Sequence, residues 1–125
     1  MRMALVVLGL LMSMASARAE KVVASGRPLM LYQAYSTNPD CTSGGAVVMR
    51  VAQGPEHGRV SIHRTGVFPR FLESNIRNVC NRRRVPGMEA TYTSQRGYLG
   101  SDLVILEVLF PNGAGRRVTL PIRVM

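Results

Sequence analysis

The sequence predicts an all-β fold, arranged as an antiparallel sandwich of about seven short strands with one disulfide bond inside the domain. Three observations predict it. Short stretches that alternate apolar and polar residues recur along the chain, between turns rich in glycine and proline. Stretches with helical periodicity are few. Cys41 and Cys80 are the two cysteines of the chain, so they allow one intradomain bond.

The first 19 residues read as a secretory signal peptide. A short basic start is followed by an uncharged apolar run at residues 4–14, and Ala17-Arg18-Ala19 fits a cleavage site after Ala19. The alternative is an uncleaved anchor helix, but the apolar run is shorter than the roughly 20 residues that span a bilayer. We therefore expect a periplasmic or secreted protein without a transmembrane anchor after processing. Residues 20–27 would be a loose lead-in and residues 28–125 the folded domain.

Four strands are predicted in the first three quarters of the domain, at residues 28–34, 46–53, 59–65 and 88–94. In the second of these strands, Val47, Met49 and Val51 lie on one face and Arg50 on the other. The segment 35–45, rich in small and polar residues, is predicted to be a loop that carries Cys41. Residues 67–79 are irregular, and strand, helix and loop all remain possible there.

A C-terminal hairpin has the strongest local pattern. Two alternating stretches, residues 103–110 and 116–124, flank the glycine-rich turn at residues 111–115. Each stretch presents one apolar face to the predicted core, made of Val104, Leu106, Val108 and Phe110 on the first and Val118, Leu120, Ile122 and Val124 on the second. Leu103, Ile105 and Leu109 also make the opposite face of the first stretch apolar, which predicts a central strand covered on both sides.

In an exported chain, Cys41 and Cys80 are expected to form a disulfide, which would stabilise the domain by roughly 4 kcal/mol in the chain-entropy model. A metal pair and a redox pair are the alternatives. The chain has no Cys-x-x-Cys motif, and His57 and His63 do not lie at ligand spacing from either cysteine. We predict no metal and no cofactor.

The chain is strongly basic. Removal of residues 1–19 would take two of the 16 Lys and Arg residues and none of the 7 acidic ones, which leaves a net charge of +7. Arg82, Arg83 and Arg84 form a run just after Cys80, and Arg77 is expected to add to the same patch, which would bind an anionic group or a partner. A disulfide would hold this run in place, so it would lose less entropy when it binds an anionic group. The alternative is a solvated run of charge without a partner.

Several short motifs, taken together in order, resemble the bacterial Ig-like, cadherin-like modules that occur in large surface and adhesion proteins. The resemblance covers roughly residues 46–124 and rests on Pro55-x-His57-Gly58-x-Val60, Ala90-Thr91-Tyr92-Thr93 and Gly97-Tyr98-x-Gly100-x-Asp102. It implies a seven-strand Ig-like β-sandwich with a structural or binding role. The chain departs from that pattern in being one module, in carrying an insert at about residues 68–85, and in lacking the acidic clusters that bind calcium.

The residues of the last motif predict a structural corner. Gly97 and Gly100 would allow a tight bend around Tyr98, whose ring would pack on the core, and Asp102 would accept backbone N–H groups. We expect Tyr92 to be a core residue too, whereas Tyr32 and Tyr35 could stack on sugars or bases. His57 is expected in a turn and His63 on an exposed strand face.

No combination of nucleophile, base and orienting group emerges, so we predict a protein that is not an enzyme. The predicted function is recognition of an envelope component, protein or anionic glycan, through the basic loop that the disulfide anchors. The alternative is an accessory subunit or inhibitor of one periplasmic protein, acting through loop insertion or edge-strand pairing. Charge alone permits nucleic-acid binding, but no reader motif predicts a specific one.

Overall fold

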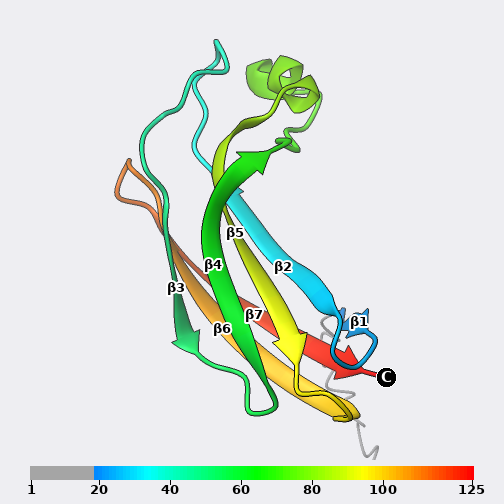
Figure 1. The fold of residues 1–125 in the computed structure, drawn as a ribbon. Helices are drawn as coiled ribbons and strands as arrows, with labels where there is room; N and C mark the ends of the chain where they lie inside the picture. Colours follow the sequence, from blue (N-terminus) through cyan, green and yellow to red (C-terminus); the bar gives the residue numbers. More distant parts are fainter. Residues whose placement is uncertain (1–18) are drawn as a thin grey trace, which may run out of the picture.

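Residues 19–125 are described by the computed structural model (Figure 1). The predicted signal peptide, residues 1–19, therefore lies outside the described residues except for Ala19. The chain order is β1 (Lys21–Val23), β2 (Pro28–Tyr35), β3 (Val48–Gln53), β4 (Gly58–Val67), the 3₁₀-helix η1 (Ile76–Arg82), β5 (Val85–Ser94), β6 (Gly100–Leu109) and β7 (Gly115–Val124). Among residues 19–125, no helix has the length and apolar character that a membrane crossing requires.

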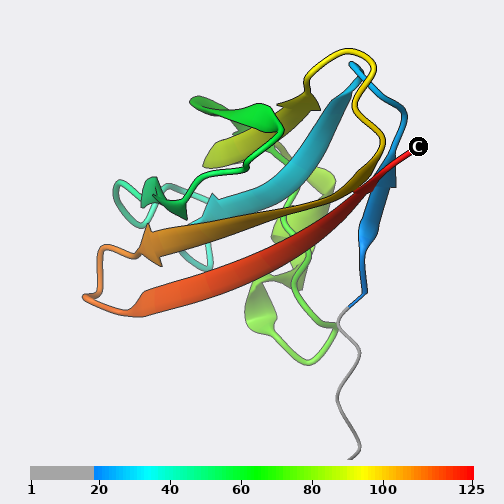
Figure 2. The ribbon, with the colours of Figure 1, turned by 90° about the horizontal axis from the view of Figure 1, so that it is seen from below.

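The strands form two sheets, one ordered β1-β7-β6-β3 and the other β2-β5-β4. Every pairing is antiparallel except that of β1 with β7. Figure 2 shows the two layers, with β6 and β7 in one and β2 in the other. The pairings β2-β5-β4 and β3-β6-β7 correspond to strands B-E-D and C-F-G of an immunoglobulin fold. The prediction of an Ig-like, seven-strand antiparallel β-sandwich is confirmed, whereas the finer resemblance to the bacterial adhesion modules stays a prediction.

The core fills the space between the two layers. On β6 and β7 the predicted apolar faces point inward, and Val104 pairs in register with Leu120 and Leu106 with Val118. The opposing sheet contributes Leu31, Ala34, Ala90 and Tyr92. Alternation with period two places the core residues of β5, β6 and β7 on one side of each strand. In β2 a bulge between Met30 and Tyr32 lets Leu31 and Ala34, three residues apart, both face the core. Burial of these side chains between the sheets drives the packing.

The outer face of β6 is not covered, contrary to the prediction. Leu109 is 43% exposed there, and Leu103 and Ile105 are only half-buried. β6 is central in the sense that β7 and β3 flank it on either side. Cross-strand neighbours such as Pro121 beside Leu103 shield the aliphatic side chains laterally, which is enough to keep them on an open sheet face.

The expected lead-in at residues 20–27 contains a strand, so its description as loose is wrong. β1 runs parallel to β7 with Lys21 opposite Ile122 and Val23 opposite Val124. Val23 joins the core, while Val22 is exposed. A parallel partner at the far end of the chain supplies the hydrogen bonds that three residues cannot make locally.

Residues 67–79, for which the sequence left strand, helix and loop open, have three parts in the structure. β4 continues to Val67, an irregular stretch follows, and η1 begins at Ile76. The connection between β4 and β5, residues 68–84, is called the insert below. Asn75 caps η1, because its side-chain oxygen accepts a hydrogen bond from the N–H of Arg77 at 2.8 Å. η1 is the one helix of the insert, and its 3₁₀ geometry is typical of short helices that connect strands.

Candidate functional site

Three connections lie at the same end of the sandwich, those between β2 and β3, β4 and β5, and β6 and β7 (Figure 1). The predicted disulfide is confirmed and joins the first two of them, with 5.4 Å between the Cα atoms of Cys41 and Cys80. Cys80 is fully buried within η1. Because a single bond ties the insert to a separate loop, residues 36–47 and the insert form one continuous surface, called the loop face below.

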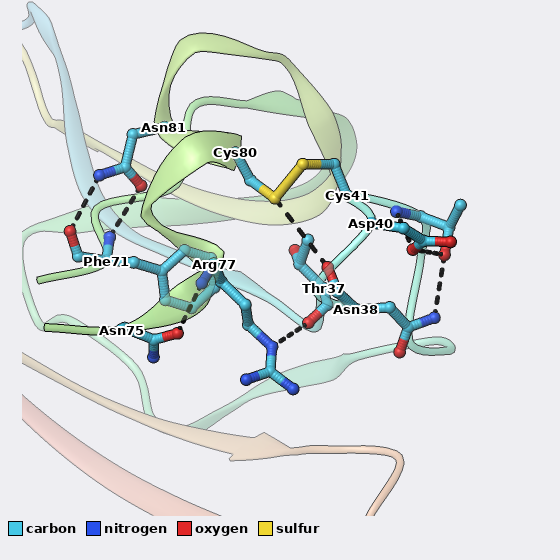
Figure 3. Close-up of a disulfide and its surroundings, with 10 residues drawn as sticks. Thr37, Asn38, Asp40, Cys41, Phe71, Asn75, Arg77, Cys80 and Asn81 are labelled. Atoms are coloured by element: carbon cyan, nitrogen blue, oxygen red, sulfur yellow. Dashed lines mark hydrogen bonds between the residues drawn. A yellow bond between two sulfur atoms is a disulfide. The ribbon is translucent and has the colours of Figure 1, made fainter. Parts of the chain in front are cut away.

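Local hydrogen bonds shape the half of the loop face that precedes β3. The Asp40 carboxylate accepts hydrogen bonds from the hydroxyl and the backbone N–H of Thr42, and these lower the pKa of Asp40. The Asn38 amide donates to the Thr42 hydroxyl at 3.0 Å (Figure 3). Cys41 has a φ of 69°, a left-handed conformation that this compact turn imposes.

Side chains that sequence reasoning did not single out for this purpose hold the insert in shape and fix it to the sandwich. The side-chain amide of Asn81 accepts a hydrogen bond from the Phe71 N–H and donates one to the Phe71 carbonyl oxygen, each at 2.9 Å. The Tyr35 hydroxyl accepts from the backbone N–H of Arg70 at 2.7 Å, and its ring meets the Phe71 ring edge-on at 5.5 Å. Tyr35 is therefore engaged in holding the insert. These contacts carry no local sequence signal, because each joins positions whose proximity depends on the finished fold.

Arg77 does not belong to the exposed arginine run. Its Nε donates to the backbone oxygen of Thr37 at 2.8 Å, so this side chain joins η1 to the β2–β3 loop beside the disulfide (Figure 3). Arg77 is half-buried. One guanidinium donor is thus used inside the protein, and the role of Arg77 in this structure is to brace the loop face.

Arg82, Arg83 and Arg84 are all exposed. Arg82 ends η1 and Arg83 is its C-cap. The guanidinium of Arg84 lies over the Phe68 ring, 5.5 Å from the centroid, a cation–π arrangement. Within residues 19–125, no ion pair involves any of the three. The structure therefore brings the three run members to one edge of the loop face with their charges uncompensated.

The predicted corner lies at the opposite end of the sandwich. Asp102 is buried and accepts hydrogen bonds from the N–H groups of Glu56, His57 and Leu103 and from the Tyr92 hydroxyl at 2.7 Å. Burial alone would raise the pKa of Asp102, but these four donors outweigh it and lower the pKa. Burial, assisted by the neighbouring Asp102 carboxylate, raises the pKa of Tyr92.

The rest of the corner follows from its glycines. Gly97 and Gly100 have φ values of 84° and 135°, which favour glycine. The Tyr98 ring is half-buried and stacks on the His57 ring with 3.9 Å between centroids, and its hydroxyl donates to the Ser101 carbonyl. The Asp102 carboxylate thus holds three backbone N–H groups and the Tyr92 hydroxyl, and the Tyr98 hydroxyl holds a backbone carbonyl, which is a structural arrangement.

The two histidines lie on different parts of the surface. His63 is exposed on β4 and lies 3.2 Å from a Glu89 carboxylate oxygen. His57 lies 3.8 Å from the Glu56 carboxylate. In the part of the chain that the structure describes, neither ring bonds a serine or cysteine side chain, and no three His, Cys, Asp or Glu residues gather as a metal site. The absence of an enzyme activity, a metal and a cofactor stays a prediction.

Comparisons with known proteins add little. No family model matches the chain, and no curated protein matches it. A solved structure, the solution structure of amebosin, is similar with a TM-score of 0.43 and 16% identity, over 83% of this chain and 86% of that chain. A likeness this distant supports no statement about fold or function.

Proposed function

We propose that this chain is an exported, non-catalytic Ig-like domain that binds an anionic envelope component, protein or glycan, through its loop face. The observation that carries the proposal is the run of three exposed arginines, unpaired with carboxylates within residues 19–125, on an insert that a disulfide joins to the neighbouring loop. Structural disulfides form in oxidising compartments, which supports export.

The charge of the loop face supports an anionic partner. The insert holds five arginines and one glutamate, and residues 36–47 add one aspartate and no basic residue, so the loop face has a net charge of +3. Guanidinium groups bind carboxylates, phosphates and sulfates through paired hydrogen bonds. Because the insert is already held by the disulfide, Arg77 and Asn81, binding would order little additional backbone.

The test compares two triple variants of equal charge. One is Arg82→Ala, Arg83→Ala and Arg84→Ala; its control is Arg27→Ala, Arg59→Ala and Arg96→Ala, three exposed residues on or near the connections at the other end. The mature oxidised domain and both variants are assayed on fractionated envelope, namely peptidoglycan, outer membrane and soluble proteins, at low and high salt.

We expect salt-sensitive retention by the wild type and the control variant and its loss in the loop-face variant. Equal loss in both variants would mean that total charge, rather than the loop face, drives binding, and full retention by the loop-face variant would refute the proposal. Thermal melts of both variants identify any failure to fold.

A second candidate function rests on the free edges of the sheets. β4 is a ten-residue edge strand in the order β2-β5-β4, and within residues 19–125 its outer edge pairs with no strand. A partner could add a strand there, which is the geometry of an accessory subunit or inhibitor. Binding of that kind would be saturable by one envelope protein and persist at high salt. A proline at an exposed position such as Ser61 would abolish it while leaving binding through the arginines intact.

A further inference from the structure

The insert exposes large apolar side chains as well as arginines. Leu72 is 76% exposed, Ile76 71%, Val79 60% and Phe68 50%. They lie within twelve consecutive residues of a segment that the disulfide and several hydrogen bonds hold in place. Scattered exposed apolar residues are normal on a protein surface, but a group of four on one fixed insert indicates a surface that contacts a membrane or another molecule. These four side chains are called the apolar tip.

The geometry of η1 places apolar and basic groups together. A 3₁₀-helix has three residues per turn, so Ile76, Val79 and Arg82 stack along one face. Cys80 points to the other side, where it is buried. Phe68 carries the Arg84 guanidinium over its ring. Each end of the apolar tip therefore has an arginine next to it.

This region stands out from one end of the sandwich. η1 and its flanking chain project beyond the ends of the strands, at the extremity of the molecule (Figure 1). Sugar rings are usually bound by aromatic faces, whereas Leu72, Ile76 and Val79 are exposed aliphatic side chains. The hollow beside Val79 is lined by Glu73, Asn78, Asn81 and Arg82, none of them aromatic. A projecting apolar group with Arg82 and Arg84 next to it, and one carboxylate, Glu73, matches the boundary between headgroups and acyl chains of an anionic bilayer. Amphipathic elements sink into that boundary by roughly 5–10 Å.

We propose that the apolar tip is a membrane-docking surface for bilayers that carry anionic lipids. The apolar side chains enter the headgroup boundary, while Arg82, Arg83, Arg84 and Arg70 bind the lipid phosphates. This inference rests on the proposed function, because it names the anionic component that the same arginines meet. An acidic protein groove is the competing occupant, and the experiment separates the two.

The experiment uses the mature oxidised domain and three probes: phosphatidylcholine vesicles, the same vesicles containing phosphatidylglycerol, and a soluble sulfated glycan. Cosedimentation measures binding to the vesicles, and fluorescence anisotropy of the labelled glycan measures binding to the glycan. The tip variant is Leu72→Ser, Ile76→Ser and Val79→Ser. Its control is Val22→Ser, Val48→Ser and Leu99→Ser, which removes side chains of comparable exposure from other parts of the surface.

We expect the wild type and the control to bind the phosphatidylglycerol vesicles and not the neutral ones. The tip variant should lose at least tenfold in vesicle affinity and keep its glycan affinity. The variant with Arg82, Arg83 and Arg84 changed to alanine should lose about a hundredfold or more on anionic vesicles, at about one kcal/mol per basic residue near the surface.

Wild-type binding to the glycan without binding to anionic vesicles would overturn the bilayer proposal and leave the proposed function standing. Unchanged vesicle binding by the tip variant would also overturn it. Failure of the wild type with the anionic vesicles, the glycan and the envelope proteins alike would overturn both. Capture of one envelope protein that the tip variant no longer binds, with no vesicle binding, would assign the tip to a protein partner.

Discussion

Replacing Asp102 with alanine tests whether one buried carboxylate organises the end of the sandwich opposite the loop face. The carboxylate accepts from three backbone N–H groups, at 3.0 Å for Glu56, 3.1 Å for His57 and 2.9 Å for Leu103, and from the Tyr92 hydroxyl at 2.7 Å. Asp102 therefore joins the β3–β4 turn to β5 and β6. Alanine would leave all four donors without this acceptor.

The size of the effect follows from how far those donors are shielded from water: the Tyr92 hydrogen bond is buried and the three backbone hydrogen bonds are part-buried. An unsatisfied buried polar group costs about 1–3 kcal/mol, so one buried and three part-buried donors would together cost about 3–4 kcal/mol. Asp102 borders a surface hollow that Gln53, Glu56, Ser101 and Leu103 also line, so water can reach part of the corner. We expect a loss of about 3–4 kcal/mol in the free energy of unfolding. Tyr92→Phe removes one of the four hydrogen bonds and should cost about 1 kcal/mol.

Urea titration followed by circular dichroism measures both losses, and a thermal melt supplies a second estimate. For a domain of this size, a loss of 3 kcal/mol lowers the melting temperature by about 12 °C or more. Glu73→Ala is the matched control, because it removes an exposed carboxylate that makes no ion pair within residues 19–125 and should change stability by less than about 0.5 kcal/mol. A folded Asp102→Ala variant that loses no more than Tyr92→Phe would refute the reasoning.

Three further predictions follow from other contacts. The pKa of Asp102 is lower in the folded state than in the unfolded chain, so the stability that its carboxylate contributes is present above about pH 4 and is lost as the pH falls through the folded pKa. A series of urea titrations at decreasing pH should show this loss of stability in the wild type and not in Asp102→Asn. Changing Cys41 and Cys80 to serine should cost about 4 kcal/mol for a loop of 39 residues, read by urea titration, and should make the insert the first site of limited proteolysis. A methyl group on Gly58 would lie 2.6 Å from the Thr93 carbonyl oxygen, so Gly58→Ala should destabilise the domain by more than about 1 kcal/mol. Gly54→Ala, whose methyl group would have nothing within 4 Å, should not destabilise it. Equal melting temperatures of the two variants would contradict the steric argument.

The sequence predicted the parts of this fold whose signals are local. The hairpin of β6 and β7 is an example, since its two strands alternate strictly and a glycine-rich turn lies between them. The disulfide was also predictable, because two cysteines allow one pairing within the chain. For the candidate site, the sequence indicated the arginine run, but it grouped Arg77 with it although that side chain braces the β2–β3 loop.

The features that sequence reasoning missed depend on distant partners. β1 has three residues, too few to show a period, and its hydrogen bonds come from the last strand of the chain. The bond between Tyr35 and the backbone of Arg70, and the clamp of Asn81 on Phe71, exist only after the insert has folded back. The outer face of β6 was predicted to be covered because an apolar strand was equated with a buried one, yet lateral neighbours suffice for half-burial.

The placement of the chain end has a practical consequence for orientation. The Met125 N–H donates to the Val23 carbonyl and the Met125 carbonyl accepts from Ser25, each at 3.0 Å, so the last residue is held beside β1. Figure 1 shows this end of the domain opposite η1. The ten residues of β5 alone span about 30 Å between the two ends. A label, biotin or solid support attached after Met125 would therefore present the insert outward, so immobilised protein would meet a vesicle or a partner with the arginines and the apolar tip first.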